Sequence, residues 1–100
     1  MIPGTTPTHY FNLPFESEML SSARVIYKQR DREILRKETG DFEMDGNTIS
    51  ISLSQEETFL FDSQYSVKIQ LAVRTKSGKV LRTMPIIVKV DECMDNEVLT

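Results

Sequence analysis

Hydrophobic and polar residues alternate most regularly over Tyr65–Val90. A period of two, rich in β-branched residues, predicts a half-buried β-strand over Tyr65–Thr75. Its apolar positions are Val67, Ile69, Leu71 and Val73. A tight turn is expected at Lys76–Lys79, where Gly78 can adopt a positive φ. A second strand over Val80–Val90 completes a long antiparallel hairpin, which we expect to carry much of the core.

Shorter alternating runs predict the remaining strands. Arg30–Glu38 also suits a helix, because it is rich in good helix formers. A hairpin is the preferred prediction there, since Gly40 and the next strand follow too closely for a packed helix. In the last strand Met84–Pro85 breaks the pattern, because proline lacks the N–H that a sheet needs. The shorter runs are His9–Leu13, Ala23–Gln29, Glu33–Lys37 and a hairpin over Phe42–Leu53 around the turn Asp45–Asn47.

One short helical turn is expected between the strands. Ser54 and Glu57 have the spacing of a capping box, in which each side chain binds the other residue's main-chain N–H. Phe59–Phe61 would then close one end of the core. Short strands with evenly spaced turns predict an all-β fold, namely an Ig-like antiparallel β-sandwich of about seven strands with one short helical turn near Ser54–Phe59. A small barrel is the alternative.

The 100 residues suit one domain with a segment at either end. Residues 1–8 contain Pro3 and Pro7, which disfavour helix, and are expected to form a flexible N-terminal arm. Residues 9–90 form the predicted β-sandwich domain. Residues 91–100 are acidic and are expected to form a C-terminal tail.

Charge is unevenly distributed along the chain, whose net charge is −3. Ser22–Lys37 holds six Lys or Arg residues against two acids, Glu38–Asp62 holds seven acids and no base, and Asp91–Glu97 adds four acids. Solvated outer faces and acidic loops would account for this pattern. Alternatively, oppositely charged parts of the molecule meet in an assembly. The acidic balance argues against nucleic acid as a partner.

The sequence offers few groups for catalysis or metal binding. It has one His and one Cys, His9 and Cys93, and four isolated glycines, so a convergent metal site or a phosphate-binding loop lacks its residues. His9 is the one candidate base for a Ser–His–acid site, and the motif Gly-x-Ser-x-Gly is missing. We therefore predict no catalytic residue, no metal ligand, no cofactor and no enzyme activity.

Two acidic clusters have simpler explanations than chemistry. Asp41, Glu43 and Asp45 alternate before a turn, but the EF-hand spacing of a calcium site is absent, so a solvated strand face is preferred. Glu56 and Glu57 are neighbours on a capped turn and do not face each other as an acid–base pair would have to.

The three tyrosines are expected to be structural. Tyr10, Tyr27 and Tyr65 each lie within an apolar pattern. Packing in the core with the hydroxyl at the rim is the preferred interpretation for each. Stacking on nucleic-acid bases is not predicted, because such sites combine exposed aromatic rings with positive charge.

Nothing in the sequence indicates secretion or a membrane. Cys93 has no partner for an internal disulfide, and no charged region followed by an apolar stretch opens the chain. No apolar run approaches the length of a membrane span. We expect a protein made in the cytoplasm without a signal peptide, and no membrane partner.

A set of four segments is distinctive. They are Thr6–Phe15, Ile26–Gln29, Leu53–Phe61, and Lys68–Gln70 followed by Lys76–Lys79. In this order they resemble a group of small uncharacterised prophage-encoded proteins of Gram-positive (Firmicutes) bacteria, over nearly the whole chain. The pattern is also similar to the N-terminal β-sandwich domain of phage baseplate upper proteins. The resemblance implies a virion or tail-assembly component and no catalytic residues.

The resemblance and the charge pattern together favour a phage-type structural or assembly protein that acts through protein–protein contacts. Its partners would be other protein subunits, and self-association through the N-terminal arm or an exposed strand edge is expected. A virion is then the implied final location. A ligand- or carbohydrate-binding β-sandwich module is the alternative, although sugar sites usually offer exposed aromatic rings and this chain has no Trp.

Overall fold

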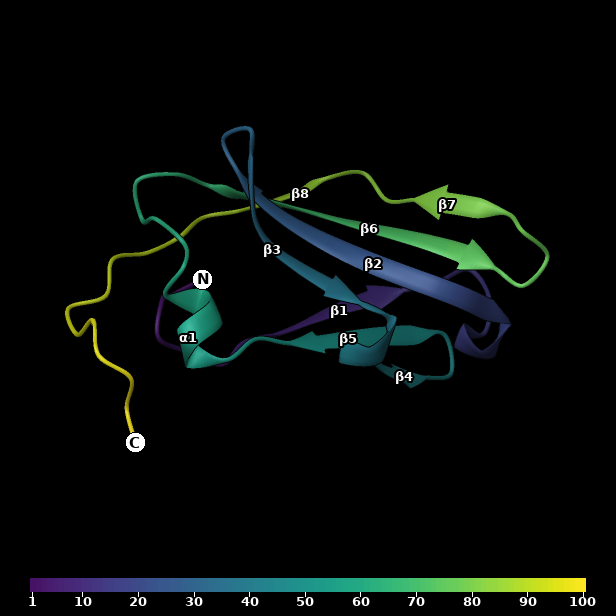
Figure 1. Cartoon of the computed structure of the whole chain (residues 1–100), viewed down its shortest axis with the longest axis horizontal. Coiled ribbons are helices and arrows are strands. Elements are labelled where there is room, and N and C mark those ends of the chain that lie inside the picture. Colours follow the sequence, from purple (N-terminus) through teal and green to yellow (C-terminus); the bar gives the residue numbers. More distant parts are fainter.

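Two antiparallel sheets packed face to face form this protein, in a computed structural model that describes residues 1–100 (Figure 1). The smaller sheet has the strand order β1-β5-β4. The larger sheet has the order β3-β2-β6-β7, with β8 also paired to β6. The predicted all-β fold, an antiparallel β-sandwich, is confirmed, with eight strands where about seven were expected. The elements are β1 (Thr8–Asn12), η1 (Ser17–Met19), β2 (Leu20–Gln29), β3 (Arg32–Glu38), η2 (Thr39–Asp41), β4 (Glu43–Asp45), β5 (Thr48–Ser52), α1 (Gln55–Thr58), β6 (Val67–Thr75), β7 (Val80–Arg82) and β8 (Ile86–Val88).

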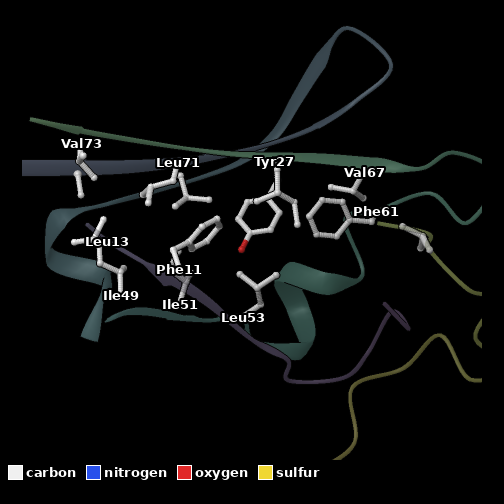
Figure 2. Packing of buried hydrophobic residues seen from close by; sticks show 14 residues of the cluster. Phe11, Leu13, Tyr27, Ile49, Ile51, Leu53, Phe61, Val67, Leu71 and Val73 are labelled. Carbon is white, nitrogen blue, oxygen red and sulfur yellow. The ribbon is translucent and has the colours of Figure 1, made fainter. Parts of the chain in front are cut away.

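Alternate side chains of both sheets build one core between them (Figure 2). The four apolar positions predicted along β6 all point inward and are buried. They meet Val25 and Tyr27 from β2, and Ile49 and Ile51 from β5, all four with no exposed surface. The apolar positions that recur every second residue in the sequence are therefore the positions that are buried in the core. The buried cluster comprises Phe11, Leu13, Ala23, Val25, Tyr27, Ile49, Ile51, Leu53, Phe61, Val67, Ile69, Leu71, Val73 and Val90.

The two shorter hairpins are confirmed. β2 pairs with β3, and β4 pairs with β5, both antiparallel. Arg30 takes the left-handed conformation, with φ 57°, in the turn that joins β2 to β3, as tight hairpin turns require. Ile34 and Leu35 pack against the core from β3, so Arg32–Glu38 is a strand and the competing helix is absent.

The last predicted strand, Val80–Val90, is divided into β7 and β8, and both pair with β6. Between them, Pro85 has no N–H to offer the ladder. Ile86 lies opposite the buried Ile69 and so points inward, yet it is 47% exposed. The core role expected of the long hairpin therefore belongs to β6, whereas β7 and β8 form a partly uncovered margin of the larger sheet.

Helix α1 closes one end of the sandwich (Figure 1). The predicted capping box is confirmed, because Glu57 N–H donates to Ser54 Oγ at 3.1 Å and Ser54 N–H donates to Glu57 Oε1 at 2.9 Å. Of the residues expected to close the core here, Phe61 is buried but Leu60 is 57% exposed. Consecutive residues of a helical turn point in different directions, so the three side chains could not all face inward.

The N-terminal segment lies against the same end of the sandwich. Thr58 is fully buried, and its Oγ1 accepts a hydrogen bond from Gly4 N–H at 2.9 Å and lies 3.0 Å from the Thr5 carbonyl oxygen. The amino group of Met1 donates to the Lys89 carbonyl at 2.6 Å. The residues expected to form a flexible arm are thus bonded to α1 and to the chain after β8.

A buried amide fixes the loop that leads from α1 into β6. Gln29 is 5% exposed and ends β2 on the inner face of the larger sheet. Its Nε2 donates to the carbonyls of Asp62 at 2.7 Å and Tyr65 at 2.9 Å, and its Oε1 accepts from Asp62 N–H at 2.8 Å. The Gln29 side chain therefore makes the hydrogen bonds to the main chain of Asp62 and Tyr65 that a neighbouring strand would otherwise make.

Candidate interaction surfaces

The outer face of the larger sheet carries a surplus of positive charge. Outward side chains alternate with the core residues along β2, β6 and β7, as the geometry of a strand requires. We call the six outward Lys and Arg residues of this sheet the basic face. Glu33 and Glu38 of β3 lie on the same side. The basic face consists of Arg24, Lys28, Arg36, Lys68, Arg74 and Arg82.

Ion pairs neutralise one margin of the basic face. Arg36 Nη2 lies 2.8 Å from Glu33 Oε1, and Glu38 Oε1 lies 3.4 Å from Arg24 Nε and 3.7 Å from Arg36 Nη1. The hydrogen bond from Arg36 lowers the pKa of Glu33. The four remaining cations form no ion pair, and they are Lys28, Lys68, Arg74 and Arg82.

Folding alone does not explain this arrangement. Lys28 and Lys68 are directly opposite each other on β2 and β6, and like charges in that position destabilise a sheet. Towards the other end of the strands, Arg24, Arg74 and Arg82 line a hollow of about 410 Å³. Arg24 is paired there with Glu38, whereas Arg74 and Arg82 form no ion pair. Unpaired cations of this kind suit the attraction of a negatively charged surface.

The outer face of the smaller sheet is rich in hydroxyl groups and carries acids without bases. Its hydroxyls bind across the sheet, with Thr8 Oγ1 lying 3.0 Å from Ser52 Oγ. Glu43 and Asp45 supply negative charge along β4. The two outer faces of the sandwich therefore carry opposite charges. The outward residues of the smaller sheet are Thr8, Tyr10, Asn12, Glu43, Asp45, Thr48, Ser50 and Ser52.

Strand β1 is an open edge of the smaller sheet, since β5 is its one partner. Leu13 N–H donates to the Asn47 carbonyl at 2.7 Å, which places the odd-numbered residues in the pairs that are bonded to β5. In an antiparallel ladder the residues between them direct N–H and C=O to the other side. These free main-chain groups belong to Thr8, Tyr10 and Asn12.

An apolar groove of about 270 Å³ lies between β1 and the β7 margin of the larger sheet. Phe11–Pro14 line one side, and Leu71, Val73 and Leu81–Thr83 line the other. Further along the same margin, the exposure of Ile86 indicates that no strand of the smaller sheet covers β8. The larger sheet therefore extends beyond the smaller one on this side.

His9, the one candidate catalytic base, binds a core tyrosine. His9 Nδ1 lies 2.7 Å from the hydroxyl of Tyr27, and the two ring centroids are 5.6 Å apart. Burial, aided by the positive N-terminal amino group, lowers the pKa of His9. Burial, aided by the charge of Glu57, raises the pKa of Tyr27. Each polar atom satisfies the other inside the core, which is a structural role.

The acidic clusters considered from the sequence are separated or locally bonded. Asp41 Oδ2 accepts a hydrogen bond from Glu38 N–H at 3.0 Å, whereas Glu43 and Asp45 point outward from β4. No group of three or more His, Cys, Asp or Glu side chains converges as metal ligands would.

Glu57 has two structural partners at once. Besides its capping bond with Ser54, Oε2 lies 2.6 Å from Lys37 Nζ of β3. Partial burial acts to raise the pKa of Glu57, but the hydrogen bonds from Lys37 and Ser54 outweigh it, and the net effect lowers the pKa. The carboxylate therefore joins α1 to the edge of the larger sheet.

The tyrosines differ from one another in exposure. Tyr27 is buried as predicted, and Tyr65 is 37% exposed with the Arg30 guanidinium 4.9 Å above its ring. The expectation that Tyr10 packs in the core is wrong, because it is 68% exposed. It lies between the inward residues His9 and Phe11, so the alternation along β1 contained the signal that it faces out.

No helix of the chain is long and apolar enough to cross a membrane. The open edge, the groove and the oppositely charged faces are the features of this molecule that suit recognition of another molecule. A comparison with protein families and with curated proteins finds no match to the chain.

Proposed function

We propose that this is a phage-type structural or assembly protein, such as a component of a virion, tail or baseplate, that works through contacts with other protein subunits. The phage type is supported by the resemblance of the four segments, of which Thr6–Phe15 and Leu53–Phe61 are the most distinctive. The contact role is supported by the surfaces of the sandwich.

The observation that carries the proposal is the unpaired positive charge of the basic face, opposite an acidic face on the same molecule. If the basic face of one copy meets the acidic face of the next, the contact is heterologous. Such contacts generate closed rings or open filaments, which are the repeated arrangements that a virion component needs. The bonds that hold residues 1–7 to their own domain favour these faces and the strand edge over the N-terminal arm as the means of association.

Size-exclusion chromatography with light scattering on the full chain tests this proposal. We expect a concentration-dependent oligomer at about 0.1 M salt that dissociates towards about 1 M salt, because the Debye length falls from about 10 Å to about 3 Å over that range. A chain that remains monomeric at every concentration and salt would overturn self-assembly as its function.

Charge reversal locates the contact. The double variant Arg74→Glu, Arg82→Glu removes two unpaired cations from the basic face, and we expect it to remain monomeric. The matched control is Lys76→Glu, Lys79→Glu, which makes the same change of charge in the exposed turn between β6 and β7. Equal masses for the two double variants would show that the basic face is not the contact.

The second candidate, a carbohydrate-binding module, is favoured by one observation. Tyr10 exposes its ring on a face of hydroxyl, amide and carboxylate side chains, and such a ring can stack on a sugar. A glycan array distinguishes the two. Binding that disappears in Tyr10→Ala would support the module, and an array without hits would exclude the glycans tested.

A further inference from the structure

We propose that the open edge of β1 accepts residues 91–100 of a second copy as an added strand. The added strand would extend the smaller sheet and cover the inner face of β7 and β8. This inference rests on the proposed function, because it adds a strand exchange to the contact between the oppositely charged faces, and assembly would require both.

The receptor has both parts that strand addition requires. Main-chain donors and acceptors of Thr8, Tyr10 and Asn12 point outward along β1, and their spacing matches an extended partner. Alternate side chains of that partner would point into the apolar groove and towards Ile86. Main-chain bonds would thus supply affinity, and the groove would supply selectivity.

The site has room for one strand and not for a second sandwich. Antiparallel pairing of β1 with β1 of another copy requires a two-fold axis perpendicular to the sheet, which keeps both larger sheets on the same side. Because the margin of β7 and β8 extends beyond β1 in each copy, the two margins would collide. The occupant is therefore a single extended segment.

Residues 91–100 have the properties of that occupant. Beyond Asp91, two hydrogen bonds between Leu99 and Gln55, of 2.8 Å and 2.9 Å, are the ones that join this segment to the domain. Met94 is fully exposed and Leu99 is 77% exposed, so these two side chains are not packed in their own chain, whereas Val98 is 40% exposed and partly covered. In an extended strand Met94 and Val98 share one face. Ten residues reach about 33 Å, twice the roughly 17 Å of a five-residue strand.

Charge favours this segment. Asp91–Thr100 carries four acids and no base, whereas Ser63–Val90, which contains β6, β7 and β8, carries six bases and no acid, although Lys68 and Arg74 point away from the groove on the outer face of the sheet. Arg82 lines the groove itself. By contrast, the N-terminal residues 1–7 lack charged side chains, contain two prolines, and are held by Thr58.

A complementation experiment tests the exchange. Tyr10→Pro removes an outward N–H from the edge and leaves the bonds to β5, as proline at an edge strand permits. The double substitution Met94→Asp, Val98→Asp places two charges on the face of the segment that would enter the apolar groove, and it leaves the edge of β1 unchanged. Each variant alone should remain monomeric in light scattering. Their equimolar mixture should give twice the mass of the chain and stop there, because one intact edge meets one intact segment.

Controls separate the edge from the fold. Tyr10→Thr keeps the N–H and should assemble as the original chain does. If circular dichroism shows that Tyr10→Pro unfolds, Ile86→Lys replaces it, since this half-exposed position tolerates a charge that would block an added strand.

The outcomes are distinct. Assembly that survives in the edge variants, or a mixture that stays monomeric, overturns the exchange. If the edge variants assemble but Arg74→Glu, Arg82→Glu does not, the proposed function stands without the strand exchange. If Met94→Asp, Val98→Asp assembles while the edge variants do not, another strand occupies the edge and the segment is excluded. A monomeric original chain overturns the exchange together with self-assembly.

Discussion

Replacement of Thr58 by valine should release the N-terminal segment from α1. The hydroxyl oxygen accepts from Gly4 N–H at 2.9 Å and lies 3.0 Å from the carbonyl oxygens of Thr5 and Gln55, and the side chain is fully buried. Valine has nearly the same volume and cannot bond, so the substitution removes these contacts without opening a cavity.

The magnitude follows from the bonds lost. A hydrogen bond contributes about 0.5–1.5 kcal/mol net, and a buried group left unpaired costs about 1–3 kcal/mol. Losing the bond that Thr58 donates and leaving Gly4 N–H unpaired should lower the free energy of unfolding by about 2–3 kcal/mol. With a urea dependence of about 1–3 kcal/mol per molar, the midpoint should fall by about 1 M. Thr58→Ser keeps the hydroxyl and loses one methyl group, for a cost of about 1 kcal/mol.

Urea unfolding followed by circular dichroism measures the difference, and amide hydrogen exchange over residues 1–7 shows where it acts. We expect faster exchange at Gly4, whose N–H loses its acceptor, in Thr58→Val but not in Thr58→Ser. A serine variant that is as damaged as the valine variant would refute the argument, because the methyl group and not the hydroxyl would then be the contact that matters.

Three further predictions concern the core and the N-terminal segment. Gly4→Ala should lower the free energy of unfolding by about 1–3 kcal/mol, since φ is +81° and the new Cβ would lie 2.6 Å from the Phe59 ring; in thermal melts Gly40→Ala, with open space around it, is the neutral control. Tyr27→Phe should cost about 1–3 kcal/mol in urea unfolding by leaving His9 Nδ1 unpaired, and a cost near zero would mean that water replaces the hydroxyl. Because burial depresses the pKa of His9, the stability that neutral His9 contributes should be fully present above its unfolded pKa of about 6.5 and be lost as pH falls through its folded pKa. The free energy of unfolding, measured at a series of pH values, should fall over that range, and His9→Gln should remove the fall.

Local patterns predicted much of the fold because they act over short distances. The alternation along β6, the capping box at Ser54 and Glu57, and the turn before β7 each depend on neighbours in the chain, and each is present in the structure. The last strand is likewise interrupted next to Pro85, as predicted from the N–H that proline lacks.

The candidate surfaces depend on pairing between distant residues, and the sequence alone could not predict them. That Lys28 lies opposite Lys68 follows from the register of β2 on β6, forty residues apart. The uncovered position of Ile86 follows from the unequal widths of the two sheets. Tyr10 is different, because its outward direction was readable from Phe11, and the apolar surroundings were given too much weight.

The three hydrogen bonds of Gln29 limit how the chain can vary among relatives. They fit a loop in which the Asp62 and Tyr65 carbonyls are a fixed distance apart, so an inserted residue would separate two acceptors that one amide now reaches. Glutamate at this position would offer no donor to either carbonyl. Length differences between related chains should therefore accumulate in turns such as Lys76–Lys79, whereas the loop before β6 keeps its length wherever a glutamine ends β2.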